Sequence, residues 1–301
     1  MTHVIGDIRD SEKMTQTMLD FDPEIVIHMA AQPLVRLSYR EPVETYEVNV
    51  MGTIHLLEAC RKLKNLKTVV IVTSDKCYDN QEQIWGYREH DAMGGFDPYS
   101  NSKGCAELVT SAYRNSFFHP DAYDQHGVVV CSGRAGNVIG GGDWSLDRLI
   151  PDAMRSHCTD GGLTIRAPHA IRPWQHVLEP LSGYLCLAES SYDRPQDVAK
   201  GWNFGPRDSE ALNVRQVLTV LQDNLGGGFT WKEEINPNDL HEATWLKLDC
   251  TAALERLDWA PRSSATDAIV MTAEWYRGQD AVARRATVDT QIASMLDTPA
   301  G

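Results

Sequence analysis

The chain has 301 residues, 42% hydrophobic and 23% charged, which is enough for a large core and for two lobes. Its formal net charge of -14 disfavours a nucleic-acid partner, because carboxylates repel a phosphate backbone, but it permits a small anionic ligand in a local basic pocket. The seven cysteines include no C-x-x-C pair, so we expect no metal site, no redox dithiol and a reducing, cytoplasmic location.

The beginning of the chain, "MTHVIGDIRD", has neither the basic start nor the apolar core of a signal peptide. No apolar run approaches the roughly 20 residues that span a bilayer. We therefore expect a soluble protein without a membrane partner.

Short apolar runs rich in β-branched residues alternate with longer helical stretches, which is typical of parallel βαβ units. We expect strands at 3–6, 24–29, 68–73, 127–132 and 201–204, and helices at 11–20, 42–63, 99–118, 178–190, 213–224 and 264–277. The pattern predicts an α/β fold with a doubly wound, Rossmann-like parallel sheet and a smaller, interleaved C-terminal lobe. The predicted division is 1–136 plus 172–205 for the first lobe and 137–171 plus 206–301 for the second.

The segment "DPYSNSK" places Tyr99 and Lys103 four residues apart, on one face of a predicted helix. A phenol with a pKa near ~10 is a weak base, but a neighbouring ammonium favours the phenolate. The alternative is a surface cation packed on an aromatic ring. Because the helix follows the strand that ends in "TSD", these groups are expected to meet at the carboxyl edge of one sheet, where doubly wound folds bind ligands.

Seven short segments together resemble one family of enzymes. They are "HMAAQ" (28–32), "NVMGT" (49–53), "TSDKCYD" (73–79), "YSNSK" (99–103), "RAGNVIGGGDW" (134–144), "RPWQHV" (172–177) and "WNFGP" (202–206). In this order they resemble the nucleotide-sugar 4,6-dehydratases, a branch of the extended short-chain dehydrogenase/reductases. The resemblance covers nearly the whole chain.

The resemblance implies an internal redox reaction on CDP-glucose with NAD as cofactor, as part of deoxysugar synthesis for lipopolysaccharide O-antigen. Tyr99 would take the proton of the sugar O4, with Ser74 bonded to O4 and Lys103 lowering the tyrosine pKa and holding the nicotinamide ribose. Asp75 would protonate the departing C6 hydroxyl, and Lys76 would stand where related enzymes carry the base for C5. The product would be CDP-4-keto-6-deoxyglucose.

These roles require a protonated Asp75 and a neutral Lys76. Each opposite charge favours ionisation of the other group, so desolvation in a closed pocket must prevail. Because the two states differ only in the position of one proton, a dry pocket can favour the neutral pair. The alternative is an ordinary loop ion pair.

The cofactor residues implied by the resemblance are Asp7, Ile8, Ala30, Ala31, Gln32, Asn49, Thr73, Tyr99 and Lys103. The chain has no strand, glycine-rich loop and helix in the order that normally cradles a pyrophosphate. "GNVIGGGDW" follows a late strand and lacks the G-x-G-x-x-G spacing. We therefore expect that the chain starts after at least one βαβ unit of the family fold, and that these 301 residues bind NAD poorly.

For the nucleotide half of the substrate the resemblance implies Asn137, Arg172 and His241. The fork of an arginine suits a diphosphate. Other interpretations are a surface ion pair for Arg172, a solvated loop residue for His241 and a turn-shaping role for Asn137.

Two alternatives to the dehydratase interpretation stay open. The chain could be another nucleotide-sugar modifier, although an epimerase would not need the Asp75–Lys76 pair. It could also be an inactive remnant that only associates with itself. The helices predicted at 42–63 and 99–118 correspond to those that pair in dimers of the family, so we expect a homodimer or a higher homo-oligomer.

Overall fold

The structure is a computed structural model that describes residues 1–159, 162–226, 229–234 and 245–298. Its strands are β1 (Ile25–His28), β2 (Thr68–Val72), β3 (Val129–Ala135), β4 (Val138–Ile139), β5 (Leu163–Ile165), β6 (Ile171–Arg172), β7 (Gln175–His176), β8 (Gly201–Phe204), β9 (Leu212–Asn213) and β10 (Trp231–Glu233). Its α-helices are α1 (Ser11–Phe21), α2 (Val35–Arg40), α3 (Pro42–Tyr46), α4 (Gly52–Cys60), α5 (Pro98–Phe117), α6 (Tyr123–His126), α7 (Leu149–Cys158), α8 (Leu178–Asp193), α9 (Pro195–Val198), α10 (Val214–Leu225), α11 (Thr251–Leu257), α12 (Ala265–Arg277) and α13 (Ala281–Asp297).

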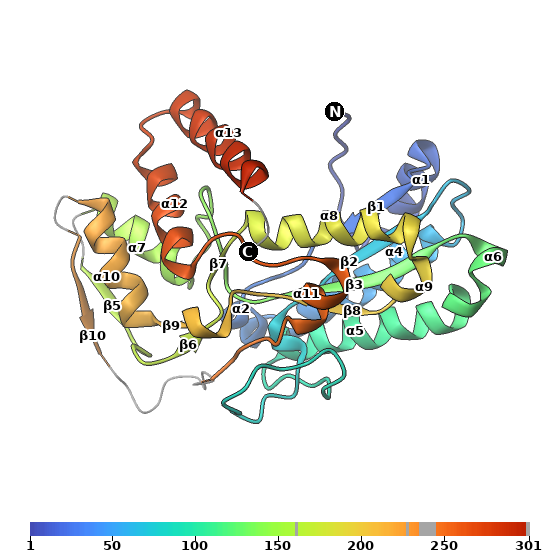
Figure 1. The fold of residues 1–301 in the computed structure, drawn as a ribbon, viewed down its shortest axis with the longest axis horizontal. Coiled ribbons are helices and arrows are strands. Elements are labelled where there is room, and N and C mark those ends of the chain that lie inside the picture. The colour runs from blue at the N-terminus through green and yellow to red at the C-terminus, as the bar shows by residue number, and fades with distance from the viewer. Residues whose placement is uncertain (160–161, 227–228, 235–244, 299–301) are drawn as a thin grey trace.

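A four-stranded parallel sheet in the order β1-β2-β3-β8 forms the centre of the larger lobe. Figure 1 shows α8 and α5 on opposite faces of this sheet. Side chains alternate between the faces, as a strand requires: Val69 and Ile71 pack with α4, whereas Val70 packs with α8 and β8. The sheet is therefore covered on both sides, as expected for a doubly wound α/β fold.

A second hydrophobic core lies in the other lobe, at the left of Figure 1. It is built from α7, α10 and α12, with Ile150, Leu218 and Ile269 nearly inaccessible to solvent. The chain passes between the two lobes more than once. In the segments that connect them, β4 pairs with β7 and β6 pairs with β9. The carboxyl ends of β2 and β3 face the junction between the lobes.

Two predicted elements differ in the structure. Residues 3–6 form no strand: Val4 is 51% exposed and Ile5 80%, and no strand of the described residues lies beside them. The helix expected over 42–63 is divided into α3, a π-helical turn at Glu47–Met51 and α4. The π turn contains Asn49, whose side chain bonds a neighbouring segment, and such turns are frequent at functional sites.

Several helices were not expected from the sequence, including α2, α7, α11 and α13. No helix in the described part of the chain is long and apolar enough to cross a membrane. No group of three or more metal-ligating side chains occurs in the same ranges. All seven cysteines are described, and each is a free thiol.

Candidate active site

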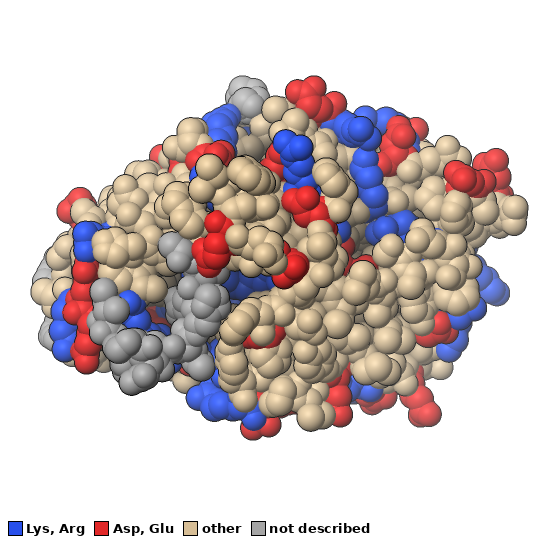
Figure 2. Space-filling view, turned by 90° about the horizontal axis from the view of Figure 1, so that it is seen from below, with Lys and Arg blue, Asp and Glu red and all other residues tan. Residues whose placement is uncertain are grey.

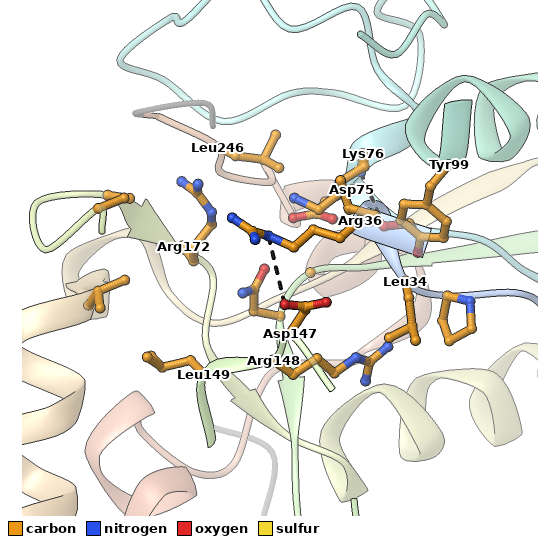
Figure 3. Close-up of a pocket in the computed structure, with 18 of the residues that line it drawn as sticks. Leu34, Arg36, Asp75, Lys76, Tyr99, Asp147, Arg148, Leu149, Arg172 and Leu246 are labelled. Carbon is orange, nitrogen blue, oxygen red and sulfur yellow. Dashed lines mark hydrogen bonds and ion pairs between the residues drawn. The ribbon is translucent and has the colours of Figure 1, made fainter. Parts of the chain in front are cut away.

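A cavity of about 750 Å³ lies where the two lobes meet, beyond the carboxyl ends of β2 and β3. Among the predicted residues, Ser74, Asp75, Lys76, Tyr99, Asn137 and Arg172 line it. Figure 3 shows Asp75, Lys76 and Tyr99 on one side of the cavity and Arg172 on another. Figure 2 shows basic atoms at the bottom of a hollow in the lower face, with acidic atoms at its edge.

The turn after β2 holds the carboxyl group of Asp75 inside the protein. Ser74 caps a single 3₁₀ turn over Asp75–Cys77: its Oγ accepts a hydrogen bond from the Lys76 backbone N–H at 3.2 Å and donates one to Asp75 Oδ1 at 2.9 Å. Asp75 is 1% exposed, and its Oδ2 is buried without a hydrogen-bond partner. A buried oxygen without a hydrogen-bond partner costs folding free energy. A hydrogen bond to a ligand in the cavity would remove this cost.

Burial raises the pKa of Asp75 above its ordinary value. The positive charge of Lys76 and the hydrogen bond from Ser74 act in the opposite direction, but burial is the largest influence. At Asp75, burial thus outweighs the neighbouring positive charge, which is the direction that its predicted role requires. A carboxyl group whose pKa is raised can keep a proton to donate.

Tyr99 and Lys103 enter from the first turns of α5. The helix is capped by Asp97, whose side chain accepts from Ser100 N at 3.0 Å, and the Tyr99 backbone N–H donates to Ser38 Oγ at 3.1 Å. These bonds hold the start of the helix, and Tyr99 with it, against α2.

The pKa of Tyr99 differs from the expectation. Burial raises it to about 12, although an interaction with Ser74 and the positive charge of Arg148 favour the phenolate. Lys103 instead donates from Nζ to Val72 O at 3.4 Å, and burial lowers its own pKa to about 8. In this structure the dominant influence on the phenol is desolvation, so a ligand that stabilises the phenolate is needed before Tyr99 acts as a base at neutral pH.

The predicted cofactor residues other than Tyr99 lie outside the cavity lining. Asn49 connects the segment after β1 to α5: its Oδ1 accepts from Gln32 N at 2.8 Å, and its Nδ2 donates to Gln32 O at 3.0 Å and to Ser102 Oγ at 2.8 Å. Ala30 is exposed and Ala31 partly exposed directly after β1. These small side chains leave the segment directly after β1 accessible to solvent.

Asp7 and Ile8 belong to the N-terminal segment, which lies against α4. The Asp7 carboxylate forms an ion pair with Arg9 at 2.7 Å, and hydrogen bonds from Arg9 lower its pKa to about 2. Ile8 packs so closely on Gly52 that a Cβ atom at that glycine would lie 2.6 Å from its Cδ1. This contact holds the N-terminal segment against α4.

A buried ion pair between Glu107 and Arg134 lies next to the segment that leads into the Asp75–Cys77 turn. Glu107 of α5, 4% exposed, accepts hydrogen bonds from Thr73 Oγ1 at 2.5 Å, Ser132 Oγ at 2.8 Å and Arg134 at 2.7 Å. Burial opposes its charge, but Arg134 and these hydrogen bonds hold the pKa of Glu107 below its ordinary value. Thr73 directly precedes Ser74, so the network joins α5 and β3 to the start of the Asp75–Cys77 turn.

The substrate residues predicted from the sequence are only partly described. Asn137 and the nearly buried Arg172 line the cavity, whereas His241 lies outside the described residues. Sequence reasoning missed three arginines of the lining, Arg36, Arg148 and Arg166. Arg36 follows the "HMAAQ" segment and Arg148 follows "GGGDW", so proximity to these motifs was the only signal available.

The comparisons with known proteins identify the family of this chain. The model of the GDP-mannose 4,6 dehydratase family matches residues 1–272. A CDP-glucose 4,6-dehydratase of Salmonella typhimurium strain LT2 is 55% identical over 280 residues, which cover 92% of this chain and 78% of that protein. A dTDP-glucose 4,6-dehydratase of Streptomyces antibioticus is 26% identical over 284 residues, which cover 92% of this chain and 76% of that protein.

Solved structures share the fold. A double mutant of the dTDP-glucose 4,6-dehydratase DesIV from Streptomyces venezuelae, with NAD and DAU bound, has a TM-score of 0.75 at 22% identity, covering 91% of this chain and 79% of that one. The UDP-glucose 4-epimerase of Thermotoga maritima with UDP-glucose has a TM-score of 0.75 at 21% identity. The match covers 90% of this chain and 83% of that one. The family match over residues 1–272 and the 55% identical relative show that this chain belongs to the GDP-mannose 4,6 dehydratase family.

Proposed function

We propose that the chain is a nucleotide-sugar 4,6-dehydratase that converts CDP-glucose to CDP-4-keto-6-deoxyglucose and water, with NAD recycled within the reaction. The observation that carries the proposal is the Asp75 carboxyl group. It is buried in the cavity with a raised pKa and one unpartnered oxygen, beside Lys76 and Tyr99. The 55% identity to a CDP-glucose 4,6-dehydratase supports CDP-glucose as the substrate.

Exposed small residues after β1 and the buried Lys103 suit the binding of NAD. We assign the cofactor to Asp7, Ile8, Ala30, Ala31, Gln32, Asn49, Thr73, Tyr99 and Lys103, as the resemblance implies. The accessible segment after β1 and the buried ammonium of Lys103 support this assignment. When bound, NAD supplies an acceptor and later a donor of hydride. Weak NAD binding by these 301 residues stays a prediction, supported by the absence of a G-x-G-x-x-G turn from the sequence.

The first task of the protein side chains is to remove the proton of the sugar O4. Tyr99 accepts this proton, and Ser74, which interacts with the phenol, holds O4 in place. The Arg148 charge already favours the phenolate and lowers the cost of ionising the buried ring. Lys103 is positioned one helical turn from Tyr99 to hold the ribose.

The second task is elimination of water across C5 and C6. A ketone at C4 makes the C5 proton acidic, and Lys76, which lines the same wall as Asp75, removes it. Asp75 Oδ2 donates its proton to the C6 hydroxyl, which leaves as water. Ser74, by donating to Oδ1, directs the free Oδ2 toward the cavity.

For the nucleotide and diphosphate we assign Asn137 and Arg172, with His241 assigned on the resemblance alone. We also propose the predicted division of the chain into a cofactor lobe and a substrate lobe. The separate core around α10 and α12 supports this division. The chain is further proposed to act in the cytoplasm as a homodimer, in deoxysugar synthesis for O-antigen.

The test is to incubate the chain with excess NAD and, separately, with CDP-, dTDP-, GDP- and UDP-glucose. Mass spectrometry is expected to show a product lighter by one water from the CDP sugar. A C4 epimer without loss of water would replace the proposal with an epimerase. No product from any sugar would favour an inactive chain that only associates with itself.

A further inference from the structure

Two carboxylates of the loop between β4 and α7 lie against arginines of the cavity. Asp143 Oδ2 accepts a hydrogen bond from Arg148 at 3.0 Å. Asp147 Oδ1 lies 3.9 Å from Nε of Arg36, which belongs to α2 in the other lobe. The second ion pair therefore crosses the cavity, as the dashed line in Figure 3 shows.

The Arg36–Asp147 pair is loosely held. The two side chains are 29% and 33% exposed, the distance is longer than a hydrogen bond, and a pair of this kind contributes little to stability. Asp147 has φ of 60°, a conformation that aspartate and asparagine tolerate better than most residues. Neither the fold nor the proposed chemistry of Tyr99 and Asp75 requires this contact.

The position of Arg36 suits a phosphate group. In Figure 3 its guanidinium lies between Arg172 and the Asp75–Tyr99 side of the cavity. A sugar at Tyr99 whose diphosphate extends toward Arg172 brings its sugar-linked phosphate to Arg36. A phosphate offers a guanidinium two acceptor oxygens and carries more negative charge than a carboxylate. In a partly desolvated cavity this difference favours the phosphate as the partner of Arg36.

We propose that Arg36 binds the sugar-linked phosphate of a nucleoside-diphosphate sugar and that Asp147 is its internal counter-ion, which the phosphate displaces. This inference rests on the proposed function and adds a contact between the lobes that forms only with substrate. Asp147 thereby competes with the substrate for Arg36 and weakens binding, while it keeps the guanidinium in the cavity when no phosphate is present.

Binding of CDP, measured by calorimetry without NAD, tests the inference, and cytidine serves as the ligand without phosphate. Arg36→Met is expected to weaken CDP binding by about 10-fold or more, because a charge-assisted hydrogen bond is lost. Asp147→Asn, which suits the same backbone conformation, is expected to strengthen CDP binding about 3-fold or more, because a competing charge is removed. Cytidine binding is expected to be unchanged in both variants.

The double variant distinguishes a counter-ion from general repulsion. If Asp147 acts through Arg36, Asp147→Asn has no effect on CDP binding once Arg36 is methionine. If Asp147→Asn strengthens CDP binding equally with arginine and with methionine at position 36, Asp147 merely repels phosphate. That result would overturn the counter-ion role. Glu233→Gln is the matched control: it removes the same charge from the Arg215–Glu233 pair outside the cavity lining, and CDP binding should not change.

Failure of the inference and failure of the proposed function give different results. If the unmodified chain binds CDP and Arg36→Met binds it equally well, the inference is wrong and the proposed function stands. If the unmodified chain binds neither CDP nor any other nucleoside diphosphate, both are wrong. Circular dichroism of each variant, together with retained cytidine binding, establishes that the substitution has not unfolded the chain.

Discussion

At the scale of single residues, Asp75 and Lys76 are adjacent in sequence but have different surroundings. Asp75 is buried on a 3₁₀ turn, whereas Lys76 is only partly buried and lines the cavity. Adjacent residues can receive opposite tasks in acid–base chemistry when their surroundings differ in this way. The predictions for the two residues are therefore different.

Lys76→Ala is expected to stop elimination and to leave NAD binding unchanged, because the lysine is assigned to the C5 proton and not to the cofactor. General base catalysis contributes roughly 10²- to 10⁴-fold, so product formation from CDP-glucose should fall by about that factor. The measurement is product formation by mass spectrometry at saturating NAD. Lys67→Ala, an exposed lysine before the same strand, is the control. Normal turnover by Lys76→Ala would remove the lysine from the mechanism.

Asp75→Asn is expected to reduce activity and to increase stability at neutral pH. The folded protein binds a proton at Asp75 at higher pH than the unfolded chain, whose aspartate has a pKa near 3.8. The contribution of Asp75 to stability is therefore fully present below about pH 3.8. It is lost as the pH rises toward and through the raised pKa of Asp75. Urea unfolding at several pH values between 8 and 5 should show the variant more stable at pH 8, with a smaller difference at pH 5. A wild type that is the more stable form at pH 8 would contradict a raised pKa.

At the scale of elements, α5 links Tyr99 and Lys103, which we assign to the redox step, to the turn that carries Asp75. Tyr99 and Lys103 lie in its first two turns, and Glu107 one turn after Lys103 bonds Thr73 and Arg134. The helix therefore fixes the distance between the phenol and the turn that carries Asp75. Residues spaced by four along one helix share a face, which is why a single element can perform both tasks.

Glu107→Gln is expected to destabilise the fold by about 3–5 kcal/mol, because it leaves the buried Arg134 without its counter-charge. Urea unfolding measures this change in the free energy of unfolding. Asp289→Asn, which breaks the exposed Arg285–Asp289 pair, should cost no more than about 1 kcal/mol. Equal effects of the two substitutions would mean that the buried network does not support the turn.

At the scale of the whole molecule, apolar side chains remain exposed on the helices that follow β1 and β2. Val43 of α3 is 69% exposed, Met51 of the π turn 43% and Leu108 of α5 59%. The helices α3 and α5 contact each other, so these residues belong to neighbouring elements. The proposed homodimer would cover such a surface.

Leu108→Glu is expected to convert the proposed dimer to a monomer, because a carboxylate would be buried twice in a symmetric interface. Light scattering after size-exclusion chromatography measures the mass of the chain and its variant. Leu185→Glu, at a leucine of α8 that is 62% exposed on the other side of the sheet, is the control and should stay dimeric. A variant at Leu108 with unchanged mass would place the interface elsewhere.

The sequence by itself determined the parallel sheet and the order of its motifs, and it predicted the residues that we assign to catalysis in the Asp75–Cys77 turn. These features depend on local patterns: a β-branched run before Thr73, an acid and a base at 75 and 76, and a tyrosine four residues before Lys103. Each pattern is contained within a few residues, so it can be read without the fold. The missing strand at 3–6 shows the limit, since a strand also needs a neighbour with which to pair.

The tertiary structure alone decided the electrostatics of the site and its missed residues. The Tyr99 pKa lies above its ordinary value because burial of the ring exceeds the influence of nearby charges, and burial is not visible in a four-residue spacing. Arg36 and Asp147 come from different lobes and meet only because the lobes enclose one cavity. Contacts between residues far apart in the chain depend on how whole elements pack, and no local pattern of residues specifies that packing.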